Sequence, residues 1–501
     1  MHSDLISIDG VTQRSVPGLA ERWSASKDGT RYVLHLRRGV KFSDGTPFTA
    51  SDVLFSWSVY LDPAVGSPQR DLLVIDGQPI RAVQTDAETV EFILPKPYAA
   101  AERLFDSIAI LPRHRLETAW KAGKLAEQWT ANADPASIAG LGPFRLKAYH
   151  PGEAVVLERN PYYWRKGASG ESLPYLDGIE FRLLADEDTQ LARFVAGELD
   201  VLGRLNLKAA GYLEKQGARI IDLGAGLEYN FLCFNLSPGH PKMAWFGSRD
   251  FRNALSQAVD REGLVRVAYD GRGVPLWGPV SPGNRLWYDA ALPRPARSVA
   301  AARQLLRQAG FRWNSSGRLE DISGQPVELS ILVSASSAER VRMATVLQAD
   351  FRELGIGVTV AQLEFRSLLD RVLKTRQFDT VLLGLGGADP DPNPEMNVWL
   401  SSGGMHLWNP GQARPAAEWE AEIDRLMRQQ MYTIEPAARK KLYHRVQRIL
   451  AAEQPMIFLA SPNIVVARSG RVGNFRPALF GHHVLWNSQE LFLQGSAAPH
   501  P

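Results

Sequence analysis

The sequence predicts an α/β protein with more than one domain. The chain has 501 residues, which exceeds what one compact hydrophobic core usually organises and indicates two or three domains. In its second half, strand-like and helix-like segments alternate with short connections, as in parallel sheets with right-handed crossovers. Hydrophobic residues make up 45% and charged residues 22% of the chain, the balance of an ordinary globular protein.

The clearest local pattern lies in residues 17–57. Two Asp-Gly pairs mark turns there, because glycine adopts positive φ easily. Between them, apolar residues alternate over 31–37, which predicts a half-buried strand. Thr49 then precedes a helix, and Asp52 follows three residues later, so we expect a capping box with Asp in place of Glu.

Further elements follow in order through the first half. The pattern predicts a strand over 90–94, helices over 99–105 and 116–130, a hairpin over 144–157 and a strand over 179–183. Asp186 is placed to cap a helix that Gly197 ends.

The second half carries the strand–helix alternation. Predicted strands cover 327–333, 356–360, 378–383 and 456–459, and predicted helices cover 338–354, 365–373, 419–431 and 436–452. Ser298 is expected to cap a further helix that Gly310 ends, and Pro436 suits the first position of its helix.

The sequence argues against several functional classes. A net charge of +3 from 57 basic and 54 acidic residues, with no dense basic run, does not favour nucleic-acid binding. Cys233 is the only cysteine, which excludes an internal disulfide and a CxxC site. No GxSxG elbow, HExxH or Walker motif is present, so we expect neither an enzyme nor a cofactor. His482 and His483 would point to opposite faces of a strand, so we expect no metal site.

The best candidate site is the loop 384–394, which follows the predicted strand 378–383. In open α/β sheets, ligands bind beyond the carboxyl ends of strands. Gly386 and Gly387 allow close approach of another backbone, and the carboxylates of Asp389 and Asp391 could hold a ligand ammonium. The loop departs from an EF-hand at its sixth and twelfth positions, so calcium is not expected.

Other candidates are isolated polar or aromatic residues. Asn235 follows a predicted strand, and it either faces a ligand or satisfies a turn. Trp277, Trp399 and Trp408 lie in Gly- and Pro-rich loops, where tryptophans either line side-chain pockets or pack in the core.

Five motifs occur in order along the chain, at 17–57, 140–164, 173–202, 251–265 and in the pair 302–311 with 351–358. Together they resemble the family 5 extracellular solute-binding proteins, the peptide- and nickel-binding receptors of bacterial ABC importers. The resemblance extends from about Leu5 to about Trp486.

The resemblance implies a two-lobed periplasmic-binding-protein fold of type II, in the large cluster with an extra subdomain. Mixed sheets with flanking helices would close about a hinge. The core of the first lobe would comprise residues 1–10, 140–226 and 462–492, and the extra subdomain would comprise 11–139. The second lobe would cover 227–461, and a disordered tail would cover 493–501.

By the same resemblance, the protein captures di- or oligopeptides between its lobes and delivers them, as a monomer, to a membrane permease. Asp389 is the closest match to the Asp that holds the peptide α-amino group, and Asp391 is the second choice. Leu385 stands where the family usually has Trp, and Asn235 matches a turn near the cleft.

A periplasmic or extracytoplasmic location is expected, although no export signal is visible. We therefore expect that the chain is truncated or that its start is assigned late. Three alternatives stay open: a sensor or chaperone-like module of the same fold, a receptor for an opine, oligosaccharide or metal chelate, and a peptide-processing enzyme.

Overall fold

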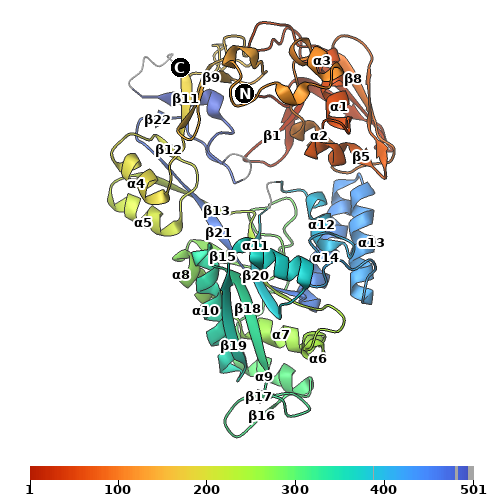
Figure 1. Ribbon diagram of the computed structural model, residues 1–501, viewed down its shortest axis with the longest axis vertical. Coiled ribbons are helices and arrows are strands. Elements are labelled where there is room, and N and C mark those ends of the chain that lie inside the picture. Colours follow the sequence, from red (N-terminus) through yellow and green to blue (C-terminus); the bar gives the residue numbers. More distant parts are fainter. Residues whose placement is uncertain (387–388, 480–482, 495–501) are drawn as a thin grey trace.

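The computed structural model describes residues 1–386, 389–479 and 483–494. Figure 1 shows two lobes joined where strands β13 (Arg219–Ala225) and β21 (Met456–Arg468) run between them. Within the described residues, no helix combines the length and apolar character needed to cross a membrane. The predicted tail lies partly outside the described residues, which end at 494.

The first lobe contains an antiparallel sheet in the order β3-β4-β8-β7 and a second sheet in the order β11-β10-β9. Its main strands are β1 (Ile6–Ile8), β2 (Ser15–Pro17), β3 (Ala20–Ala25), β4 (Arg31–Leu36), β7 (Arg81–Gln84), β8 (Thr89–Ile93), β9 (Phe144–His150), β10 (Ala154–Arg159), β11 (Gly178–Arg182) and β12 (Val201–Leu202). Its helices are α1 (Ala50–Leu61), α2 (Ala101–Ser107), α3 (Arg113–Lys121), α4 (Glu187–Val195) and α5 (Leu207–Lys215).

Helix α1 begins as the sequence predicts. The Oδ2 of Asp52 accepts a hydrogen bond of 2.9 Å from the backbone amide of Thr49, which completes the capping box. Trp57 on this helix packs against Phe92 of β8, with 4.6 Å between ring centroids. The helix thus covers the apolar face of the four-stranded sheet.

The second lobe is built on the large mixed sheet β12-β21-β14-β20-β18-β19, to which β13 and β15 add by pairing with β21. Its further strands are β14 (Tyr229–Phe234), β15 (Gly273–Pro275), β18 (Glu328–Ser334), β19 (Gly357–Leu363) and β20 (Thr380–Leu385). Its helices are α6 (Met243–Phe246), α7 (Arg249–Ala258), α8 (Arg261–Tyr269), α9 (Val299–Gln308), α10 (Ala338–Glu353), α11 (Phe365–Leu369), α12 (Met396–Trp399), α13 (Glu418–Tyr432) and α14 (Pro436–Glu453).

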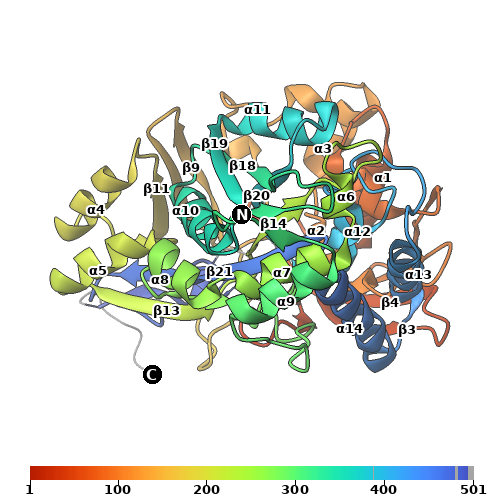
Figure 2. The ribbon, with the colours of Figure 1, turned by 90° about the horizontal axis from the view of Figure 1, so that it is seen from below.

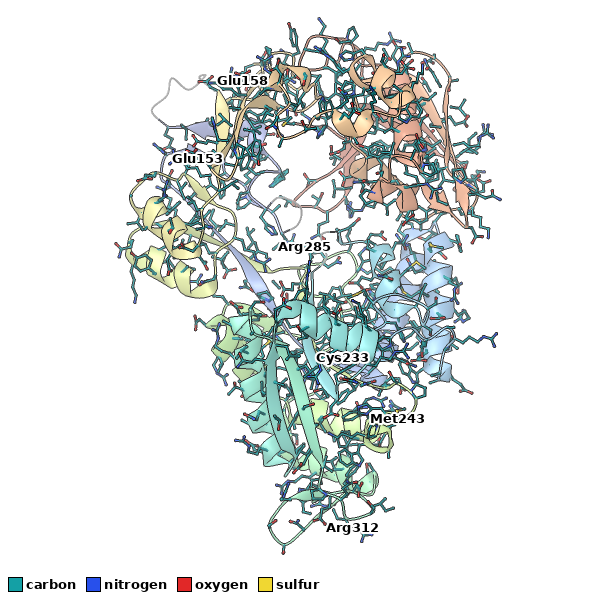
Figure 3. All side chains as sticks on the ribbon, viewed as in Figure 1. Glu153, Glu158, Cys233, Met243, Arg285 and Arg312 are labelled. Carbon is teal, nitrogen blue, oxygen red and sulfur yellow. The ribbon has the colours of Figure 1, made fainter. Side chains whose placement is uncertain are left out.

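Parallel pairing in this sheet agrees with the predicted crossovers. Strand β18 pairs in parallel with both β19 and β20, whereas β14 runs antiparallel to β20 and β21. Helices α7, α8 and α9 lie together along one side of the sheet (Figure 2). Figure 3 places Cys233 among the strands of this lobe, where it is fully buried.

Three predicted elements have different bounds in the structure. The helix expected over 116–130 is the shorter α3, and Gly123, two residues after its end, has a φ of +69°. The helix expected over 365–373 changes from α11 to a π-helical turn at Asp370–Thr375. Strand β21 has 13 residues where a short strand over 456–459 was expected, since Pro462 suggests an earlier end.

Two hydrophobic clusters bear on the predicted domains, and the domain boundaries themselves stay a prediction. Leu5 and Ile6 pack in one cluster with side chains from residues 19–141, although residues 1–10 were grouped with 140–226. A smaller cluster joins α4 and α5 to Val465 and Ala467 near the end of β21. Strand β21 therefore contributes to the packing of both lobes.

Candidate ligand-binding site

The loop that follows β20 lies where the first lobe meets the second. Residues 387–388 are outside the described structure, so the prediction for Gly387 is not addressed by it. Leu385 ends β20, pairs with Tyr229 of β14 and is half-buried. No heavy atom of the described residues lies within 4 Å of where a Cβ on Gly386 would be, so this position has room for a side chain.

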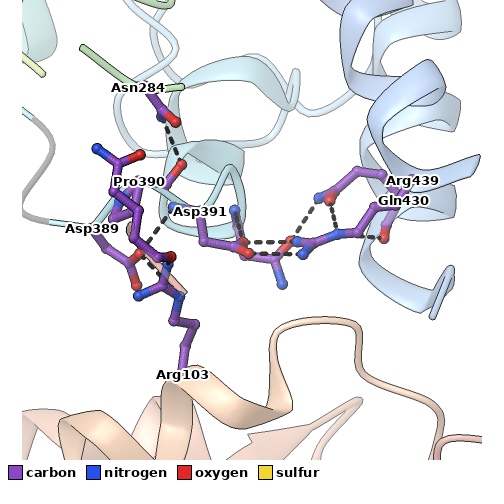
Figure 4. Close-up of polar contacts among 9 residues, drawn as sticks. Arg103, Asn284, Asp389, Pro390, Asp391, Gln430 and Arg439 are labelled. Atoms are coloured by element: carbon purple, nitrogen blue, oxygen red, sulfur yellow. Dashed lines mark hydrogen bonds and ion pairs between the residues drawn. The ribbon is translucent and has the colours of Figure 1, made fainter. Parts of the chain in front are cut away.

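Asp391 is committed to a buried ion pair within the second lobe. Its two carboxylate oxygens accept hydrogen bonds of 2.7 Å from Nη1 and Nη2 of Arg439 on α14 (Figure 4). Its Oδ1 also accepts 2.9 Å from the backbone amide of Asn393. Because both side chains are less than 10% exposed, the pair fixes the loop on α14 and leaves Asp391 unsuited as a ligand anchor.

Asp389 is less firmly held. The Nε of Arg103, on α2 of the first lobe, lies 3.7 Å from its Oδ1, which is too long for a hydrogen bond. The same oxygen accepts 2.9 Å from the backbone amide of Asp391. Burial raises the pKa of Asp389, and the charge of Arg103 acts against that shift. The carboxylate, 31% exposed, is the one in this loop that is free to take another cation.

Polar groups of both lobes surround Asp389. The Nδ2 of Asn284 donates 2.8 Å to the carbonyl oxygen of Pro390, and Asn284 lines a small cavity together with Asp389. The Nε2 of Gln13 donates 2.9 Å to the carbonyl oxygen of Gly283, which adds a second contact between the lobes. Among the described residues, none donates to the buried Oδ1 of Asn284.

A larger cavity of about 790 Å³ opens beyond the carboxyl end of β18, where Ser336 and Ser337 contribute to its lining. Glu228 on its floor accepts hydrogen bonds from Arg204 at 3.0 Å and from Arg340 at 3.1 Å. The Nε of Arg340 donates 2.8 Å to Asn230, which in turn donates 2.8 Å to the hydroxyl of Tyr269. The lining therefore presents both acidic and basic groups.

Gly384 connects this cavity to the loop. It is paired with Asn230 in the sheet, and a Cβ at this position would collide with the Arg340 guanidinium and the Asn230 carboxamide. Glycine at this position therefore leaves room for the Arg340 and Asn230 side chains beside β20. Asp389 follows five residues later in the chain and lines the small cavity rather than this larger one.

Four other predicted residues lie elsewhere. Asn235 is buried, and its Nδ2 donates to the carbonyl oxygens of Arg376 and Phe378, so it fixes a turn. Trp399 and Trp408 are buried in the core of the second lobe, with their indole N–H groups on Glu395 and Glu420. Trp277 is half-buried and donates 3.3 Å to the carbonyl oxygen of Pro295.

Sequence reasoning missed the charged groups that face the candidate residues. Arg103 lies within a predicted helix, Arg340 lies in the first turn of another, and Glu228 directly precedes β14. No local motif marks them, because their role depends on which elements the fold brings together. His482 lies outside the described residues, and the described ones include no group of three or more His, Cys, Asp or Glu side chains arranged for a metal.

Comparison with known proteins places this geometry in context. A family model described as bacterial extracellular solute-binding proteins, family 5 Middle, matches residues 14–406. A probable ABC transporter-binding protein of Deinococcus radiodurans is 30% identical over 494 residues, covering 93% of this chain and 83% of that protein. Di/tripeptide-binding protein 1 of Pseudomonas aeruginosa is 26% identical over 93% of this chain and 84% of its own length.

The fold has solved counterparts. The crystal structure of the ABC transporter substrate-binding protein CtaP from Listeria monocytogenes superposes with a TM-score of 0.82 at 24% identity. The match covers 98% of this chain and 93% of that chain, so the similarity extends over both lobes.

Proposed function

The chain belongs to the bacterial extracellular solute-binding proteins of family 5, the receptors of ABC importers, and we propose that its solute is a di- or oligopeptide held between the two lobes. The observation that carries this proposal is the carboxylate of Asp389, which lies at the junction of the lobes with only a loose partner. Asp391, two residues away, is saturated by Arg439 and leaves Asp389 as the anchor for an ammonium group.

The surroundings of Asp389 suit the rest of a peptide. The space beside Gly386 leaves room for an extended peptide, which would pair with the end of β20 by β-augmentation. The polar cavity beyond β18 offers room and both signs of charge for side chains and a terminal carboxylate. A relative in Pseudomonas aeruginosa that bears the name of a di/tripeptide-binding protein supports the same class of solute.

Delivery requires that the lobes open and close. Strand β21 contributes to both lobes, and β13 and β14, which follow one another in the chain, both pair with it. A change of backbone angles where these strands pass between the lobes would act as a hinge. The partner that the family implies is the permease of an ABC importer, and the protein would act as a monomer outside the cytoplasm without catalysing a reaction. A sensor role on the same fold, and an opine, oligosaccharide or metal chelate as solute, are the competing proposals.

Native mass spectrometry of freshly purified protein tests the solute class. A heterogeneous set of co-purifying peptides, released unchanged on denaturation, would support the proposal. A single sugar, opine or metal chelate would contradict the peptide assignment, and steady turnover of an added peptide would contradict the receptor assignment.

A further inference from the structure

Helix α2 presents a cation and an anion to the same junction. Arg103 and Asp106 are three residues apart and therefore share one face of the helix. The Arg103 side chain is only 14% exposed, and its Nη2 donates 3.3 Å to the carbonyl oxygen of Gln13. Its Nε faces Asp389 on the opposite lobe, so the first lobe supplies a cation at the place proposed for the ligand ammonium.

Two carboxylates compete for this guanidinium. Asp106 lies one helical turn from Arg103, which itself contacts Asp389. The pKa of Asp106 is raised to about 6, chiefly by burial, while the charge of Arg103 acts against this shift and that of Asp389 adds to it. The neighbouring acids have cations of their own: Asp391 pairs with Arg439, and Arg165 acts on Asp4. Arg103, Asp106 and Asp389 together therefore carry one negative charge in excess when both acids are ionised.

The two ion pairs of the loop differ in strength. Arg439 holds Asp391 by two hydrogen bonds of 2.7 Å, whereas Arg103 approaches Asp389 by one contact of 3.7 Å. A contact of that length lacks the hydrogen bonding that makes guanidinium–carboxylate pairs strong. The Arg103–Asp389 pair is consequently the one that a small cation can replace.

We propose that Arg103 is a specificity-determining residue of the cleft, which pairs with Asp389 in the ligand-free protein and turns to Asp106 when a ligand ammonium takes its place. This inference rests on the proposed function and narrows it to solutes with one cationic group at Asp389. A primary ammonium neutralises the excess charge and leaves each carboxylate with a partner. A solute without a cation leaves Arg103 on Asp389 and gains nothing from that carboxylate.

The variant Arg103→Gln separates these roles. Without the guanidinium, closure of the empty cleft leaves Asp389 unpaired, so the ligand-free lobes should lie further apart. An ammonium ligand no longer competes with Arg103, so trialanine should bind at least threefold more tightly. N-acetyl-trialanine should bind more weakly, because closure would then bury Asp389 with no cation.

Spin labels at Ser58→Cys and Gln308→Cys measure the separation of the lobes, since the native Cys233 is buried and escapes labelling. Isothermal titration calorimetry measures the affinities for trialanine and N-acetyl-trialanine. Arg103→Lys should keep the wild-type distances, and Arg113→Gln, which removes only an exposed pair with Glu117, should change neither readout.

Asp106→Asn provides an independent test with the opposite sign. It removes the second partner of Arg103, so trialanine should bind at least threefold more weakly while the ligand-free distances stay unchanged. Unchanged distances and an unchanged ratio of the two peptide affinities in Arg103→Gln would overturn the inference. If trialanine does not bind the wild-type protein, the peptide proposal fails, and the label distances still decide whether Arg103 holds the empty lobes together.

Discussion

Arg103 and Asp389 face one another across the two lobes, with Nε 3.7 Å from Oδ1. The pair joins helix α2 to the loop after β20, the two segments between which a peptide would enter. Both side chains are partly buried, and no hydrogen bond joins one to the other, so the two charges are partly desolvated but only weakly paired. A cationic group of a ligand could therefore displace Arg103 from Asp389 at small cost.

The buried pair of Asp391 and Arg439 should be essential to stability. We expect Arg439→Met to lower the free energy of unfolding by about 3–5 kcal/mol, because it leaves a buried carboxylate without its partner. Urea denaturation followed by tryptophan fluorescence measures the change. Arg445→Met, on the exposed side of the same helix, is the matched control and should stay within about 0.5 kcal/mol of wild type. Equal values for the two variants would show that the pair does not hold the loop.

Affinity for an ammonium ligand should depend on pH. The pKa of Asp106 is raised to about 6 and that of Asp389 is also raised, chiefly by burial, with Arg103 acting against both shifts and Asp4 close to Asp106. A bound ammonium favours the ionised carboxylates, so binding releases protons near pH 6. Affinity for trialanine should consequently fall several-fold as pH decreases from 7.5 to 5.

Calorimetry in two buffers of different ionisation enthalpy measures the released protons directly. N-acetyl-trialanine should show little change over the same pH range, and Asp106→Asn should reduce the release. Proton uptake on trialanine binding would contradict the assignment of these carboxylates to the site.

A side chain at position 384 should lower the stability of the protein. In Gly384→Ala the added Cβ collides with Arg340 and Asn230, and overpacking of this kind typically costs about 1–3 kcal/mol. Gly470→Ala is a suitable control, because no heavy atom of the described residues lies within 4 Å of its Cβ position. Thermal unfolding of both variants measures the difference. A variant at 384 as stable as the one at 470 would mean that the cavity floor rearranges freely.

The fold followed from sequence more readily than the site. The crossovers around β18, β19 and β20 were predictable because each strand and helix buries its own periodic set of apolar residues. The length of β21 could not be predicted in the same way. Pro462 suggests that the strand ends early, but pairing with β13 and β15 continues it past this residue. Local patterns determine local elements, and long-range pairing extends them.

The candidate residues show the same limit. The resemblance ranks Asp389 ahead of Asp391, but only the fold shows that Arg439 neutralises Asp391 while Asp389 faces Arg103. Trp399 and Trp408 lie in loops by sequence, yet tertiary packing buries both rings in the core. The partners of a residue, which decide its role, come from segments far away in the chain.

The most direct test of the account is the affinity of Asp389→Asn for trialanine and for N-acetyl-trialanine, measured by isothermal titration calorimetry at pH 7.5. Loss of the carboxylate should weaken trialanine binding about 30-fold or more, equivalent to ~2 kcal/mol, because the ammonium loses its anchor. Binding of the acetylated peptide should change little, and Asp370→Asn, at an exposed acid, should leave both affinities unchanged. Equal losses for the two peptides would contradict the role of Asp389 as the ammonium anchor.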